Sequence, residues 1–170
     1  QSSTHELAKD MLALRKFVAP EFIFGEGALE LCGRYCQNLG LKKVLLVSDQ
    51  GVQDTGLVEE VRSVLSAAGT ASEVFLGISP NPRDCEVAAG VEAYSQSAAN
   101  GIVALGGGSP MDCAKGIGVV HTNGRHVLEF EGIDQVAMPS VPLICVPTTA
   151  GTSADVSQFA IIKDTMDKVK

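Results

Sequence analysis

The chain alternates short apolar runs with longer segments in which apolar residues recur at helical spacing. The apolar runs cover residues 44–48, 72–76, 101–105 and 143–146, and each is closed by Gly, Pro, Ser or Asp. Runs this short and rich in Val, Leu or Ile are typical of buried strands. The helical segments between them cover residues 28–39, 57–68, 83–99 and a stretch that begins after Ser109. This alternation predicts a doubly wound α/β fold with a mostly parallel sheet.

An additional apolar segment precedes the alternating region. Residues 17–24 predict an N-terminal strand arm, and residues 1–16 form an N-terminal segment before it. No internal repeat or low-complexity linker interrupts the rest. We therefore expect one domain over residues 17–170.

Composition limits the classes of function. Hydrophobic residues make up 45% of the 170 residues but aromatic ones only 5%, so the core must consist of Val, Leu, Ile and Ala, as under a parallel sheet. The formal net charge of −7 argues against a surface that binds nucleic acid or anionic membranes. An anionic ligand therefore needs a local device, such as a helix N-terminus, to overcome the overall negative charge.

The N-terminal residues carry no apolar signal-peptide core, and no segment is long and apolar enough to span a bilayer. We therefore expect a cytoplasmic protein with no membrane partner. The five cysteines are irregularly spaced, with Cys32 and Cys36 on one helical face. We expect them to be small buried residues in a reducing compartment.

The most informative segment is residues 106–115, GGGSPMDCAK, which follows a predicted strand and opens a helix. Three adjacent glycines let the backbone approach a ligand without an intervening Cβ. Ser109 is expected to cap the helix, with Pro110 in its first turn and Asp112 completing a capping box. The exposed amides and the helix dipole then favour a phosphate group. The alternative is a tight turn before a well-capped helix.

Polar residues also follow the other strands. Asp49 can accept hydrogen bonds from two ribose hydroxyls, or it only caps the turn that follows it. The segment 148–157 has five hydroxyls in ten positions, which can donate to phosphate or a carboxamide, or cap a helix. The loop 79–83 has two prolines and presents the Asn81 amide, although by itself it is an ordinary turn.

Together these four elements resemble one family, the iron-containing (group III) alcohol dehydrogenases. The matching segments, in the family's order, are residues 44–49, 80–82, 106–115 and 147–156. The resemblance implies that this chain is the N-terminal, nucleotide-binding half of such an enzyme. The family's C-terminal, all-helical domain is absent from it. At residues 151–156 the chain reads GTSADV where many relatives read GTGSEV, which leaves the substrate preference open.

The resemblance also implies roles in binding NAD. Asp49 would bind the adenosine ribose and favour NAD over NADP. The pyrophosphate would bind at residues 107–109, and Asp112 would lie near the nicotinamide end. The residues implied to line the cofactor site are Asp49, Asn81, Gly107, Gly108, Ser109, Asp112, Thr148, Thr149, Thr152, Val156, Ser157 and Lys170.

A catalytic metal is part of the same resemblance. The family binds Fe²⁺ or Zn²⁺ through one Asp and three His beyond the equivalent of Lys170, so the metal ligands are expected outside this chain. His5, His121 and His126 match none of them. No catalytic or metal-binding residue is therefore expected within the chain.

The implied activity of the full-length protein is the transfer of a hydride between a primary or small alcohol and the nicotinamide. The substrate is thus a small alcohol or the corresponding aldehyde. The resemblance also implies that the arm at residues 17–24 pairs with a partner subunit in a homodimer or higher homo-oligomer. Two alternatives remain. One is a non-catalytic nucleotide-binding module, and the other is a polyol dehydrogenase or sugar-phosphate lyase of the same superfamily.

Overall fold

A computed structural model describes residues 26–132, 135–150, 154 and 160–165. The N-terminal segment and the predicted strand arm at 17–24 lie outside these residues, so both stay predictions. The elements, in chain order, are the 3-10 helix η1 (Ala28–Glu30), α2 (Leu31–Asn38), β1 (Lys43–Val47), α3 (Gln50–Asp54), α4 (Leu57–Ala67), β2 (Ala71–Phe75), α5 (Asp84–Ser97), β3 (Gly101–Gly106), α6 (Gly108–Asn123), the 3-10 helix η2 (Val127–Phe130) and β4 (Leu143–Pro147).

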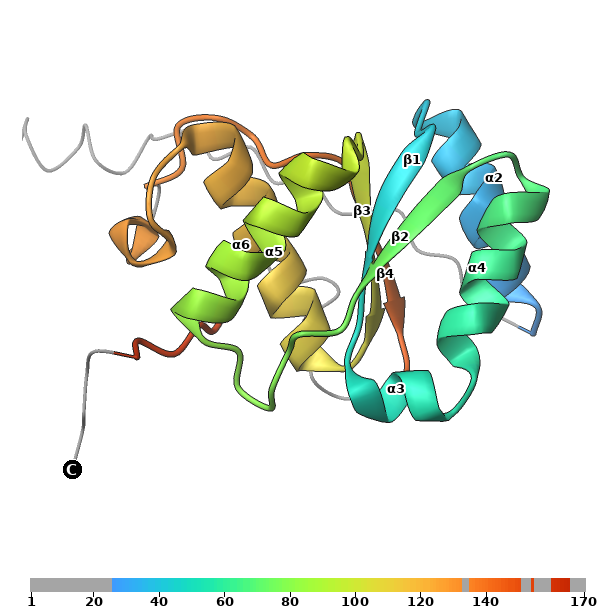
Figure 1. Cartoon of the computed structure of the whole chain (residues 1–170), viewed down its shortest axis with the longest axis horizontal. Coiled ribbons are helices and arrows are strands. Elements are labelled where there is room, and N and C mark those ends of the chain that lie inside the picture. Colours follow the sequence, from blue (N-terminus) through green and yellow to red (C-terminus); the bar gives the residue numbers. More distant parts are fainter. Residues whose placement is uncertain (1–25, 133–134, 151–153, 155–159, 166–170) are drawn as a thin grey trace, which may run out of the picture.

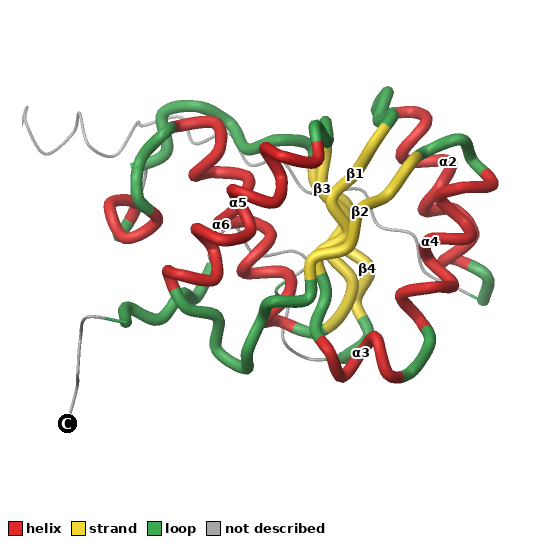
Figure 2. Tube along the Cα trace, viewed as in Figure 1, coloured by secondary structure: helices red, strands yellow, loops and turns green. Residues whose placement is uncertain are grey.

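The four strands form one parallel sheet in the order β2-β1-β3-β4. Helices α5 and α6 cover one face of the sheet, and α2 and α4 cover the other (Figure 1). Figure 2 shows the resulting three layers, with the sheet between two layers of helices. The predicted doubly wound α/β fold is confirmed.

The two central strands supply both cores because their side chains alternate between the faces of the sheet. In β1, Leu45 and Val47 pack towards α5 and α6, whereas Val44 and Leu46 pack towards α2 and α4. All six residues of β3 are buried. Burial on both faces explains why these strands are continuous apolar runs rather than alternating ones.

The predicted elements lie within a few residues of the observed ones, and two short helices were not predicted. Helix α3 has only five residues and η2 has four. A helix this short shows too little periodicity to be recognised in a sequence. The four predicted strands and the four predicted helical segments are all present. Among the described residues, no helix has the length and apolar character needed to cross a membrane.

Candidate functional site

The connections between the strands place a switch point between β1 and β3. From β1 the chain passes through α3 and α4 to β2 on one side, and then through α5 back across β1 to β3 on the other side. Adjacent strands whose connections leave in opposite directions open a crevice at their carboxyl ends, where doubly wound proteins bind ligands. The residues at these two ends are Ser48 and Asp49 after β1, and 106–109 at the end of β3.

The end of β1 is held firmly in place. The buried Ser48 donates its hydroxyl to the Leu105 carbonyl of β3 at 2.8 Å. Asp49 is the N-cap of α3, where its Oδ1 accepts from the Val52 N–H at 2.9 Å. Of the two interpretations of Asp49, capping is therefore present in the structure. Binding of a ribose by the same carboxylate stays a prediction.

The glycine loop turns the chain directly from β3 into α6. Gly106 has a φ of +142°, in a region that residues with a side chain rarely adopt. A Cβ on Gly106 would lie 2.8 Å from Cγ of Pro110. Gly106 is therefore needed for the turn itself, and this position could not be recognised among three consecutive glycines in the sequence.

The start of α6 differs from the prediction. Gly107, and not Ser109, is the N-cap, and no side chain caps the helix. The expected capping box of Ser109 and Asp112 is therefore wrong. The reason is that the glycine backbone enters the helix early, which places Ser109 inside the first turn. There its hydroxyl Oγ accepts from the Asn81 N–H at 3.3 Å.

The threonine loop lies beside the glycine loop. Strand β4 pairs with β3 up to Pro147, and the Thr148 N–H then donates to the Gly106 carbonyl at 2.9 Å. A Cβ on Gly107 would lie 3.2 Å from Oγ1 of Thr149. Both threonines are exposed. The sheet therefore brings together two loops that are about forty residues apart in the sequence.

The Asn81 loop approaches from the end of β2. Its contact with Ser109 joins it to the N-terminus of α6. Asn81 itself has a φ of +60°, one of two positive φ values among the described residues other than glycine. Such a conformation costs free energy and is typical of residues held in place for a function.

Asp112 lies deeper than the rest of the predicted site and is 9% exposed. Its Oδ2 accepts from the Ile161 N–H at 3.2 Å, and its Oδ1 lies 3.6 Å from Nζ of Lys115. The Lys115 side chain is 15% exposed and pairs with Asp112. Asp112 therefore joins α6 to the segment that precedes the end of the chain.

The structure thus brings most of the predicted site residues to one edge of the sheet. Four predicted residues cannot be placed, because Thr152, Val156, Ser157 and Lys170 lie outside the described residues.

No group of three His, Cys, Asp or Glu side chains suited to a metal ion occurs among the residues that the structure describes. His121 packs edge-on against Tyr94, with ring centroids 4.6 Å apart, and Nε2 of His126 lies 3.9 Å from Oδ2 of Asp84. The Cys113 thiol lies in α6, and burial, with help from the charge of Glu86 and Asp112, raises its pKa to about 12. A thiol with so high a pKa is a poor nucleophile at neutral pH.

None of the five cysteines forms a disulfide, and Cys32, Cys36 and Cys113 are buried. A hydrogen bond with Cys36, together with burial, raises the pKa of Cys32, and the same hydrogen bond lowers the pKa of Cys36. The expectation of small buried residues is confirmed for these three thiols. Cys85 is exposed, and Cys145 is partly buried, so for them it is wrong.

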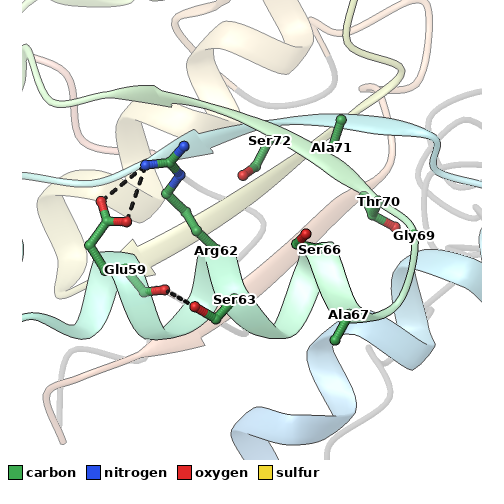
Figure 3. A pocket seen from close by; sticks show the side chains of 9 residues that line it. All are labelled: Glu59, Arg62, Ser63, Ser66, Ala67, Gly69, Thr70, Ala71 and Ser72. Atoms are coloured by element: carbon green, nitrogen blue, oxygen red, sulfur yellow. Dashed lines mark hydrogen bonds and ion pairs between the residues drawn. The ribbon is translucent and has the colours of Figure 1, made fainter.

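A surface hollow lies elsewhere, between the second half of α4 and the first residues of β2 (Figure 3). Its lining includes Ser66, Thr70 and Arg62, whose guanidinium is paired with Glu59 at 3.1 Å. This position is at the amino end of a parallel strand, which is the edge of the sheet opposite the switch point. The hollow is therefore not the ligand site that the topology indicates.

The chemistry at the switch point suits an anionic ligand with a sugar. The first N–H groups of a helix have no partner within it, and here no side chain caps them. The helix dipole adds a partial positive charge at the same point. Gly107 and Gly108 place no side chain in the way of a pyrophosphate. The residues present therefore fit a dinucleotide.

The sequence and the fold agree with known proteins. The model of the iron-containing alcohol dehydrogenase family matches residues 19–170. The chain belongs to the iron-containing alcohol dehydrogenase family. It is 37% identical over 154 residues to the NAD-dependent methanol dehydrogenase of Bacillus methanolicus, which covers 91% of this chain.

Solved structures of this family share the fold. A 1,3-propanediol oxidoreductase superposes with a TM-score of 0.87 and 36% identity over 92% of the chain. The sulfoacetaldehyde reductase of Bifidobacterium kashiwanohense, solved in complex with NAD⁺, gives a TM-score of 0.79 and 29% identity over 90% of the chain. The chain spans about 40% of the length of these dehydrogenases, since it covers 40% of the methanol dehydrogenase and 41% of each solved structure.

Proposed function

We propose that this chain binds NAD(H) at the carboxyl ends of β1 and β3. The observation that carries the proposal is the N-terminus of α6, which no side chain caps, at the switch point of the sheet. The matches to an NAD-dependent methanol dehydrogenase and to a sulfoacetaldehyde reductase solved with NAD⁺ support the same ligand. This chain would then be the cofactor-binding half of an NAD-dependent alcohol dehydrogenase of the iron-containing family.

Each residue at this edge has a distinct part in the proposal. Pro110 has no N–H, so the N–H groups of Gly108 and Ser109 are the first-turn donors available to the pyrophosphate. The carboxylate of Asp49 accepts from the ribose hydroxyls and repels a 2′-phosphate. The hydroxyls of Thr148 and Thr149 lie beside the glycine loop and donate to phosphate or to the carboxamide.

The reaction of the whole enzyme follows from this cofactor. NAD⁺ held at this edge would accept a hydride from a primary or small alcohol, which also loses its hydroxyl proton, and NADH would return a hydride to the aldehyde. The names of the relatives, which include methanol and 1,3-propanediol dehydrogenases, support an alcohol substrate. We propose that the ligands of the Fe²⁺ or Zn²⁺ ion come from sequence outside this chain. A whole enzyme acting in the cytoplasm as a homodimer or higher homo-oligomer is part of the same proposal.

The test is a titration of the 170-residue chain with NADH, followed by the change in nicotinamide fluorescence. We expect saturable binding at one site per chain. ADP-ribose should compete with NADH, because it carries the pyrophosphate and both riboses, whereas nicotinamide alone should not. The control is Ser66→Ala in the hollow of Figure 3, which should leave binding unchanged. Absence of saturable NADH binding would contradict the proposal.

A further inference from the structure

The loop from Ser79 to Arg83 presents Asn81 at the candidate cofactor site, and its conformation is unusual. Pro82 disfavours the right-handed helical region for Asn81, and the observed φ is +60°. Asn is one of the few residues that occupy the left-handed region at moderate cost. A strained residue persists only when its surroundings hold it there. The contacts that hold this loop therefore bear on how Asn81 is presented.

The hydrogen bonds of the loop can be counted completely on the donor side. The prolines at positions 80 and 82 have no N–H, so the only backbone donors from 79 to 83 belong to Ser79, Asn81 and Arg83. The Ser79 N–H donates to Oε1 of Glu86 at 3.3 Å, and the Arg83 N–H donates to Oε2 of Glu86 at 2.8 Å. The third donor, of Asn81, reaches Oγ of Ser109 at 3.3 Å. All three donors are thus bound by side chains, two of them by a single carboxylate.

Glu86 does more than cap its own helix. It is the third residue of α5, and its bond to the Arg83 N–H is the usual half of a capping box. A capping box does not explain the bond to Ser79, which lies outside the helix on the far side of Asn81. One carboxylate therefore joins the two ends of the loop. The loop is also joined to the segment 160–165, because the Pro82 carbonyl accepts from the Lys163 N–H at 2.8 Å.

We propose that Glu86 is a positioning residue for cofactor binding, because its carboxylate fixes both ends of the loop and so holds Asn81 in its left-handed conformation beside Ser109. This proposal rests on the proposed function, in which the edge at Ser109 binds NAD(H). Glu86 itself does not touch the cofactor in it. The effect of Glu86 on affinity must therefore pass through Asn81.

The test measures NADH dissociation constants for the 170-residue chain and its variants. Glu86→Ala removes both acceptors, and we expect about tenfold weaker binding, the size of one hydrogen bond between Asn81 and the cofactor. Glu86→Gln keeps one acceptor oxygen, so it should weaken binding less. The matched control is Glu92→Ala, an exposed residue on the same helix whose carboxylate accepts from Gln96 at 2.9 Å. It should leave the affinity unchanged.

A second background separates positioning from general stability. In Asn81→Gly the loop adopts a positive φ without strain and has no side chain to present. Adding Glu86→Ala to this variant should change the dissociation constant by less than about twofold, because the two substitutions act on one element. A purely structural role of Glu86 predicts the same fold-change in both backgrounds, and that result would overturn the proposal.

Hydrogen exchange of the nucleotide-free chain gives an independent reading. The amides of Ser79 and Arg83 should exchange faster in Glu86→Ala, while amides in β3 keep their protection. If the unaltered chain does not bind NADH, the proposed function fails and the positioning role fails with it. If the unaltered chain binds NADH, and Glu86→Ala and Glu86→Gln both bind it as tightly as the unaltered chain does, only the positioning role fails. Should Glu86→Ala not fold, the comparison of Glu86→Gln in the two backgrounds decides in the same way.

Discussion

Replacement by alanine should lower the folding stability at Gly106 but the affinity for NADH at the neighbouring Gly107. At Gly106 the φ of +142° is strained for alanine, which costs about 1–3 kcal/mol of folding free energy. The new Cβ would also lie 2.8 Å from Cγ of Pro110, and overpacking of this kind costs about 1–3 kcal/mol. We expect Gly106→Ala to lose about 2–6 kcal/mol, a large part of the 5–15 kcal/mol typical of a domain.

Gly107 has an ordinary φ of −87°, and a Cβ there would lie 3.2 Å from Oγ1 of Thr149 on an exposed loop. Alanine is a poorer N-cap than glycine by about 0.5–1 kcal/mol, but it lowers the entropy of the unfolded chain by a similar amount. The free energy of unfolding of Gly107→Ala should therefore stay within about 1 kcal/mol of the unaltered chain. Its affinity for NADH should fall at least about tenfold, because the methyl group occupies the approach of the pyrophosphate.

The assay is urea denaturation followed by far-UV circular dichroism, combined with NADH titration of each folded variant. Equal stability of Gly106→Ala and the unaltered chain would refute the packing argument at the turn. A stable Gly107→Ala variant that binds NADH normally would show that the pyrophosphate does not approach this glycine.

Three further predictions concern charge and metal. Asp49→Asn keeps the cap on α3 but removes the charge that repels a 2′-phosphate, so the preference for NADH over NADPH should narrow in paired titrations. An unchanged ratio of the two dissociation constants would show that Asp49 is not part of the cofactor site. Burial raises the pKa of Asp84, but hydrogen bonds from Thr165 and Cys85 and the charge of His126 together hold it below its usual value. The ionised Asp84 therefore stabilises the fold fully above about pH 4, and this effect is lost as the pH falls through the lowered pKa. In Asp84→Asn the free energy of unfolding, measured by urea denaturation, should fall less steeply from pH 5 to pH 2. The purified chain should retain no stoichiometric iron or zinc and should not reduce NAD with ethanol, because the described residues offer no cluster of metal ligands. Elemental analysis measures the metal, and absorbance at 340 nm measures the reduction of NAD. Bound metal with turnover would show that the catalytic site lies within this chain and not partly in a second domain.

The sequence by itself determined the layers of this protein and the segments that carry its chemistry. Short apolar runs can be recognised as strands because β1 and β3 are buried on both faces and tolerate few polar residues. The glycine block at 106–108 stands out because a turn from strand to helix needs glycine at one position, here Gly106, and not at three in succession. These signals are local, so they survive in a linear sequence.

The arrangement of these segments at one point was decided by the tertiary structure. The strand order, and hence the switch point between β1 and β3, depends on how α5 crosses the sheet. The sequence of a single helix or strand does not specify this order. The start of α6 at Gly108 rather than beyond Ser109 follows from the turn at Gly106, and it frees the Ser109 hydroxyl for Asn81. The two bonds of Glu86 likewise depend on the fold of the loop before α5. Contacts of this kind join residues through space, and a pattern of residue types along the chain cannot specify their geometry.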